Sequence, residues 1–119
     1  MKTDRELLEL AAKAAGYTVL GVECIDEYSE ARYAGSIVLE CKDEHDWPFS
    51  FAPLDDDGDC ARLEVSCELQ VDIGDIGVIS ERLDGTACFE KYADHDGDKN
   101  KARRRASVRA AAAIGESMP

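Results

Sequence analysis

The sequence has no run of apolar residues long enough to cross a membrane, which takes about 20 residues in a helix. It also lacks the uncharged apolar core of a secretion signal, because residues 1–16 include Asp4, Glu6 and Glu9. We therefore expect a cytoplasmic protein that has no membrane partner.

The sequence has no cysteine spacing that is typical of metal or redox motifs. The number of cysteines is odd, and no two of them form C-x-x-C. Most of them stand within alternating apolar stretches, which without a secretion signal predicts reduced, buried thiols instead of disulfides. The five are Cys24, Cys41, Cys60, Cys67 and Cys88.

Signatures of catalysis and of cofactor binding are missing as well. His45 and His95 stand apart from each other and from any grouped cysteines, which argues against zinc. The chain has no G-x-S-x-G motif and no glycine-rich loop with phosphate-binding spacing. We therefore expect neither an enzyme nor a bound cofactor.

One loop partly matches the calcium-binding loop of EF-hands. Asp94, Asp96 and Asp98 stand at its first, third and fifth positions. Lys99 replaces the glycine of position six, and Arg105 replaces the bidentate glutamate of position twelve. Two cations in place of these residues favour a charged loop that caps the following helix, so no metal site is predicted.

Basic residues are scarce outside the C-terminal segment. The formal net charge is −12, so the average surface repels nucleic acid and anionic membranes. Residues 1–98 hold 25 acidic and 8 basic side chains, whereas residues 99–119 hold 1 acidic and 6 basic ones. The candidate binding residues are an acidic cluster (Asp55, Asp56, Asp57 and Asp59) and a basic helix at 99–109 (Lys99, Lys101, Arg103, Arg104, Arg105 and Arg109).

Both charged segments have a structural interpretation beside the functional one. Carboxylates at 55–59 are typical of a helix start, where they accept hydrogen bonds from free N–H groups. A nuclease magnesium site would also need a companion lysine or histidine, and the cluster has none. The cations at 99–109 either face the acidic surface of the protein itself, which we favour, or contact a protein or a nucleic acid.

The two ends of the chain predict helices. Thr3 and Glu6 form a capping box for a helix over residues 4–15, which Gly16 ends. Residues 101–118 predict an alanine-rich helix whose buried face includes Ala111, Ile114 and Met118. Alanines at 11–15 and 110–113 would let these two helices approach closely.

The remaining elements are mostly strands. Apolar alternation predicts a strand at 18–26, with Leu20, Val22 and Cys24 on one face, and a hairpin of 34–42 with 47–52. Pro48 places the latter strand at a sheet edge. A second hairpin, 77–82 with 86–92, turns at Asp84-Gly85. Residues 27–32 and 93–100 read as loops.

Two stretches allow more than one interpretation. The aromatics Trp47, Phe49 and Phe51 alternate, and we favour a core face over a platform for stacked bases. Residues 63–69 suit either a helix or a strand, and we favour a helix over 57–67 followed by a strand to Ile73. The sequence thus predicts one α+β domain over residues 1–119: an antiparallel sheet of about four to six strands, packed by N- and C-terminal helices, with a short middle helix.

Three segments together resemble a group of small, uncharacterised proteins encoded by bacteriophages and prophages. They are DRELLELAAKAAG (residues 4–16), PL-x-DDGD-xx-RL (residues 53–63) and RR-xxx-VRAAA-x-IG (residues 103–115). The resemblance implies a bacterial host and supplies no catalytic residue. In that setting, accessory proteins often bind and block host machinery, including CRISPR and restriction systems.

Two functional hypotheses follow. The first is a binding module that inhibits or adapts a host protein, its acidic surface meeting a basic partner and imitating phosphates. The second is a nucleic-acid-associated protein that uses the basic helix at 99–109. Neither the host partner nor the oligomeric state follows from the residues.

Overall fold

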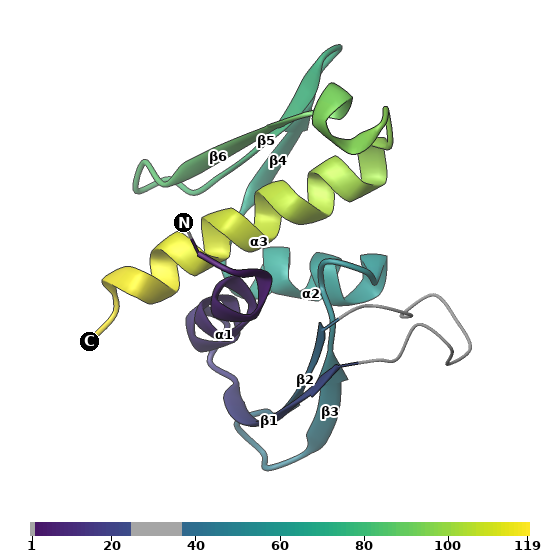
Figure 1. Cartoon of the computed structure of the whole chain (residues 1–119). Coiled ribbons are helices and arrows are strands. Elements are labelled where there is room, and N and C mark those ends of the chain that lie inside the picture. Colours follow the sequence, from purple (N-terminus) through teal and green to yellow (C-terminus); the bar gives the residue numbers. More distant parts are fainter. Residues whose placement is uncertain (1, 25–36) are drawn as a thin grey trace.

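The structure, a computed structural model, describes residues 2–24 and 37–119, and the fold is α+β (Figure 1). The expected loop at 27–32 and the start of the expected hairpin at 34–36 lie outside the described residues. The helices are α1 (Asp4–Ala14), α2 (Asp57–Ser66) and α3 (Lys99–Ser117), with a short 3-10 turn, η1 (Tyr92–His95), before α3. The strands are β1 (Thr18–Cys24), β2 (Ile37–Lys42), β3 (Pro48–Phe51), β4 (Gln70–Ile73), β5 (Gly77–Glu81) and β6 (Ala87–Lys91).

The described strands form two antiparallel sheets of three strands each, not the single sheet that we expected. The first sheet has the order β1-β2-β3 and the second β4-β5-β6. Figure 1 shows α3 running between them, with α1 and α2 on its side toward the first sheet. The sequence pattern predicted both hairpins. Whether two hairpins join into one sheet depends on residues far apart in the chain, which periodicity does not encode.

The N-terminal helix begins and ends at local signals. The Thr3 hydroxyl accepts a hydrogen bond from the Glu6 N–H at 3.2 Å, as the predicted capping box requires. Gly16 has φ +85°, and Tyr17 N–H donates to the Ala12 carbonyl at 2.9 Å. This is the hydrogen-bond pattern of a Schellman C-terminus, in which a left-handed residue favours glycine.

Both terminal helices approach closely, as their alanines predicted. Ala11, Ala12 and Ala111 are at most 1% exposed. A Cβ added to Gly115 would lie 2.0 Å from the Leu10 carbonyl oxygen, so the α1 backbone occupies the space of a side chain there. Met118, expected on the buried face, is instead 39% exposed, because α3 ends at Ser117 and the chain turns extended.

Large residues of the core come from α1, the first sheet and α2. Leu8, Leu39, Phe51 and Leu63 are at most 1% exposed and belong to one buried cluster. Burial of this kind stabilises a fold by about 1.5–3 kcal/mol per large apolar side chain.

The predicted face of the first strand is wrong at Leu20, which is 57% exposed. The pairing of β1 with β2 shifts register between Val19 and Gly21, and this bulge puts Val19 and Val22 against the core. An extra residue in one strand reverses the alternation beyond it. The side chain of Cys24 lies outside the described residues.

The aromatic stripe faces the core over two of its three residues. Phe49 and Phe51 pack edge-to-face with Tyr17, with ring centroids 4.8 and 5.4 Å from its ring. Trp47 stands before β3 and is 70% exposed. Pro48 opens β3, which is an edge strand as expected.

The ambiguous middle segment is helical up to Ser66 and becomes a strand at Gln70. Leu63 and Cys67 are buried while Val65 is 79% exposed, which is the burial pattern of a helix. The second hairpin also forms as predicted, with Gly85 at φ +100° in its turn. The helix after it begins at Lys99, two residues before the predicted start. None of the helices in the described ranges is long and apolar enough to span a membrane.

Candidate functional site

Two members of the acidic cluster hold the start of α2 in place. Asp56 is its N-cap and accepts a hydrogen bond from the Asp59 N–H at 3.0 Å. Asp59 is buried, accepts from the Ala52 N–H at 2.9 Å and pairs with Arg62. Asp56 therefore satisfies a backbone donor that the helix start leaves free, whereas Asp59 ties the helix to the segment that follows β3. Both are the structural interpretation of the cluster.

The other two members, Asp55 and Asp57, have different surroundings. Asp57 is exposed and forms an ion pair with Arg104, 2.6 Å from its guanidinium. Asp55 is half-buried and lines a cavity of about 300 Å³. The four aspartates are thus neighbours in the chain, and only Asp57 among them is exposed.

The arginines of the basic helix are bound by carboxylates of the protein itself. Arg104 pairs with Asp57 and also donates to the Leu54 carbonyl at 2.8 Å. Arg105 pairs with Asp4 at the start of α1. Arg109 pairs with Glu90 of β6, which also contacts His95 at 2.8 Å.

Arg103 belongs to a buried polar network that connects α2, α3 and the second sheet. Its guanidinium forms hydrogen bonds of 3.1 and 2.6 Å with both carboxylate oxygens of Glu64. The Ser107 hydroxyl lies 2.6 Å from Glu64 and 3.1 Å from the Ser80 hydroxyl. The sequence does not reveal the roles of Glu64, Ser80 and Ser107, because each bond of the network joins residues that are 27 to 43 positions apart along the chain. The only local signal is that Glu64 follows Cys60 by one helical turn on the buried face.

The basic helix keeps two cations without an ion pair to any described residue. Lys101 is exposed, and Lys99 is exposed with its ammonium 5.3 Å from the Tyr92 ring centroid. Asp98 caps this helix through the Lys101 N–H at 3.0 Å, which lowers the pKa of Asp98. The expected capping role of the 94–98 loop is therefore confirmed.

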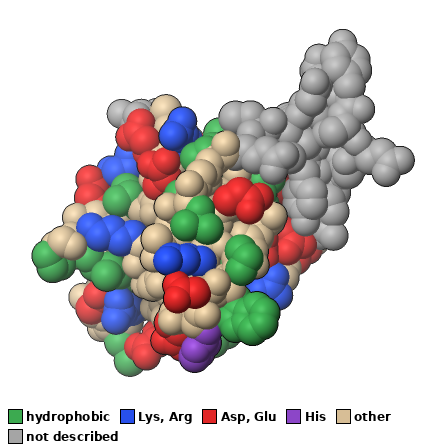
Figure 2. Space-filling view, turned by 90° about the horizontal axis from the view of Figure 1, so that it is seen from below, with side chains coloured by type: hydrophobic (Ala, Val, Ile, Leu, Met, Phe, Trp, Pro, Cys, Tyr) green, Lys and Arg blue, Asp and Glu red, His purple; other side chains and the backbone are tan. Residues whose placement is uncertain are grey.

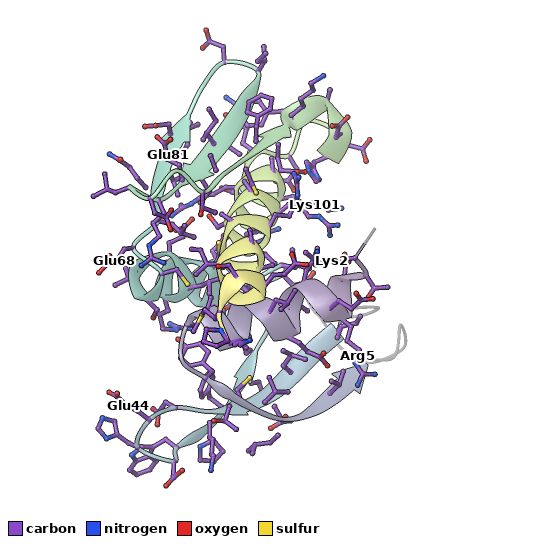
Figure 3. The ribbon with its side chains drawn as sticks, turned by 90° about the vertical axis from the view of Figure 1, so that its left-hand side faces the viewer. Lys2, Arg5, Glu44, Glu68, Glu81 and Lys101 are labelled. Atoms are coloured by element: carbon purple, nitrogen blue, oxygen red, sulfur yellow. The ribbon has the colours of Figure 1, made fainter. Side chains whose placement is uncertain are left out.

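Five carboxylates in and beside the second sheet have no ion pair with any residue in the described ranges. Glu68, Asp72, Asp75 and Asp84 are exposed, and Glu81 is half-buried. Figure 3 places Glu68 and Glu81 on one side of α3, and Lys2, Arg5 and Lys101 on the other.

Around the first sheet the surface has a different character. Figure 2 shows acidic, basic and apolar side chains interspersed there, without one dominant patch. On this side Lys42 pairs with Asp46 at 3.0 Å. Such exposed pairs contribute about 0–1 kcal/mol each and leave little net field.

The thiols have the environment of structural cysteines. Cys41, Cys60 and Cys67 are free and buried, as expected, and Cys88 is free and half-buried. Burial raises the pKa of Cys60 to about 12, assisted by the Glu64 carboxylate. Burial likewise raises the pKa of Cys41 and of Cys67 to about 11. Because the thiolate is the reactive form, these groups are poor nucleophiles at neutral pH.

In residues 2–24 and 37–119, no three His, Cys, Asp or Glu side chains are grouped as metal ligands. No family model, no curated protein and no solved structure matches the chain.

Proposed function

We propose that this protein is a binding module whose carboxylates engage a positively charged surface of a partner protein. One observation carries the proposal. The four arginines of the basic helix are bound by the protein's own carboxylates, whereas five carboxylates in and beside the second sheet, Glu68, Asp72, Asp75, Glu81 and Asp84, form no ion pair with any described residue.

The physical reason is electrostatic steering. A net charge of −12 attracts a cationic surface over about one Debye length, roughly 8–10 Å in physiological salt, and raises the association rate. Carboxylates that are already paired contribute little to this field, so the unpaired ones, those at 68–84 among them, supply most of the attraction.

The resemblance to bacteriophage and prophage proteins supplies the setting of the proposal. The partner would be a host protein in the bacterial cytoplasm. A cationic groove that binds nucleic acid, as in CRISPR or restriction machinery, is the kind of surface that such carboxylates would occupy in place of phosphates.

The test is affinity purification of the tagged protein from a bacterial host after nuclease treatment, at low and moderate salt. We expect a basic protein in stoichiometric amount, bound at low salt and released as salt rises. Expression of the chain should then restore plaque formation by a phage that the host's CRISPR or restriction system blocks. Recovery of an acidic partner, or binding that does not change with salt, would contradict the proposal.

The nucleic-acid hypothesis is tested with the exposed lysines. Replacing Arg103 would break its pair with Glu64 and confuse loss of binding with loss of folding. Lys99→Ala with Lys101→Ala removes the two cations of the basic helix that have no ion pair with any described residue. Salt-dependent binding of duplex DNA by the wild-type chain, lost in this variant, would replace the acidic-module proposal by the alternative.

A further inference from the structure

The second sheet is covered by helix on one face only. Val78 and Ser80 of β5 point to the covered side, where they are at most 1% exposed and α3 packs. Residues that alternate with them point the other way. Figure 1 shows no helix of the described chain on that outer side.

Two large apolar side chains lie next to each other on this open face. Ile79 of β5 is the direct cross-strand partner of Phe89 of β6. Ile79 is 37% exposed and Phe89 is 42% exposed. Directly opposite residues share one face of an antiparallel pair, so the two side chains form a single apolar contact.

Gly77 leaves room for the Phe89 ring and fixes its position. A Cβ at Gly77 would lie 2.5 Å from Cζ of Phe89, so the ring lies across the glycine backbone. An aromatic ring that covers a glycine in a sheet is supported by it and loses little rotational freedom on binding. The exposed ring is thus positioned before any partner arrives.

Carboxylates border the apolar pair on two sides, and one exposed cation, Lys91, lies on the same face two residues after Phe89. Asp72 of β4 is the other cross-strand partner of Ile79, and Glu81 follows two residues after Ile79 on the same face. Asp84 stands exposed in the adjoining turn. The first sheet does not have this combination of residues. On the face that carries Glu40, the cross-strand neighbours are Glu40 with Ser50 and Lys42 with Pro48.

We infer that the open face of the second sheet, formed by Asp72, Ile79, Glu81 and Phe89, is the docking surface for a cationic protein segment with apolar side chains. This inference rests on the proposed function and identifies its contact surface. In a second copy the same face also carries more carboxylates (Asp72 and Glu81) than cations (Lys91), and like net charges at close range oppose association. A partner segment with lysine or arginine around an apolar centre complements the surface in charge and in apolar contact, with Phe89 as the anchor.

The probe is a short synthetic peptide of alternating Leu and Lys, with a Ser and Lys peptide of equal charge for comparison. Amide chemical-shift mapping of the full chain should place the Leu and Lys peptide on β4, β5 and β6. Phe89→Ser should weaken its binding about tenfold or more, as removal of an aromatic anchor does. The Ser and Lys peptide should bind more weakly and respond little to that substitution.

Two further variants separate the contributions. Asp72→Asn with Glu81→Gln keeps side-chain size and should reduce both peptide affinity and its salt dependence. The matched controls are Leu20→Ser, which changes an exposed apolar residue of the first sheet, and Asp94→Asn with Asp96→Asn, which changes exposed carboxylates elsewhere. Both controls should bind like the wild type, and thermal unfolding should show that every variant is folded.

The outcomes distinguish this inference from the proposed function. Salt-sensitive peptide binding that maps outside β4, β5 and β6, or that survives Phe89→Ser, overturns the docking surface and leaves an acidic binding module. Absence of binding by either cationic peptide contradicts both. Sedimentation that shows a dimer lost on Phe89→Ser would assign the surface to a second copy and overturn the cationic partner.

Discussion

Arg103 of α3 and Glu64 of α2 form a two-point ion pair, with Nε–Oε2 at 3.1 Å and Nη2–Oε1 at 2.6 Å. The Glu64 side chain is 7% exposed, whereas that of Arg103 is 40% exposed. The carboxylate is therefore the buried member of the pair and depends on its partners for the solvation that water no longer gives. The hydrogen bonds to Glu64 also raise the pKa of Arg103.

Removal of the cation should be costly. We expect Arg103→Ala to lower the free energy of unfolding by about 2–4 kcal/mol, because it leaves a buried charge with only hydroxyl and thiol partners. Urea unfolding measured at neutral pH checks this value. Arg5→Ala, which breaks an exposed pair with Glu9, is the control and should cost about 0.5 kcal/mol or less.

The double variant Glu64→Leu with Arg103→Leu should be less destabilised than Arg103→Ala. It removes both charges, and the Ser107 and Ser80 hydroxyls still bond to each other at 3.1 Å. Equal loss in the single and the double variants would show that the ion pair is not what joins α2 to α3.

The buried thiols predict a loss of stability in alkali. The pKa of Cys60 is raised from an ordinary value of 9.0 to about 12, so between these values the unfolded chain has lost a proton that the folded chain keeps. The contribution of Cys60 to the free energy of unfolding is fully present below pH 9. Above pH 9 it falls by at most about 1.4 kcal/mol per pH unit. Urea unfolding at pH 8, 9 and 10 should show the fall, and Cys60→Ala should make it shallower.

The contact between α1 and α3 predicts an asymmetry between two glycine positions. Gly115→Ala should destabilise by about 3 kcal/mol, because the new methyl group meets the Leu10 carbonyl of a packed helix. Gly58→Ala is the matched control, since its neighbours there are flexible side chains 3.4 Å away or more. That control should stabilise by about 0.5–1 kcal/mol through the lower entropy of the unfolded chain. Similar melting temperatures for both variants would contradict the close approach.

The alanine face of α3 gives a further prediction. Ala111 is fully buried, so Ala111→Leu should overpack the space between the helices and destabilise by about 1–3 kcal/mol. Differential scanning calorimetry measures the effect. Ala113, which is exposed on the same helix, supplies the comparison, because Ala113→Leu should leave the melting temperature nearly unchanged.

Local signals explain why much of the fold was predictable. Thr3 with Glu6, and Gly16 in the left-handed region, act on backbone groups a few residues away, and they placed α1 within one residue. The prediction that Leu20 faces the core was wrong because a bulge depends on the partner strand, which the alternation of a single strand does not reveal. The prediction that Trp47 faces the core was wrong because the strand begins one residue after it.

The candidate site divides in the same way. The sequence located the acidic and basic segments, and the Asp56 cap is a local hydrogen bond that its position predicts. The pairing of Arg104 with Asp57, or of Arg105 with Asp4, joins residues up to 101 positions apart. Only the folded chain decides which charges neutralise each other.

By itself, the sequence determined the helices, both hairpins, the helix ends and an acidic balance of charge, because these follow from periodicity, capping and composition. Tertiary structure alone decided that the strands divide into two sheets around α3, that Glu64 meets Arg103, and that Ile79 and Phe89 remain exposed together. The physical reason is range: backbone hydrogen bonds and side-chain alternation act between near neighbours, whereas burial and charge pairing depend on residues that only folding brings into contact.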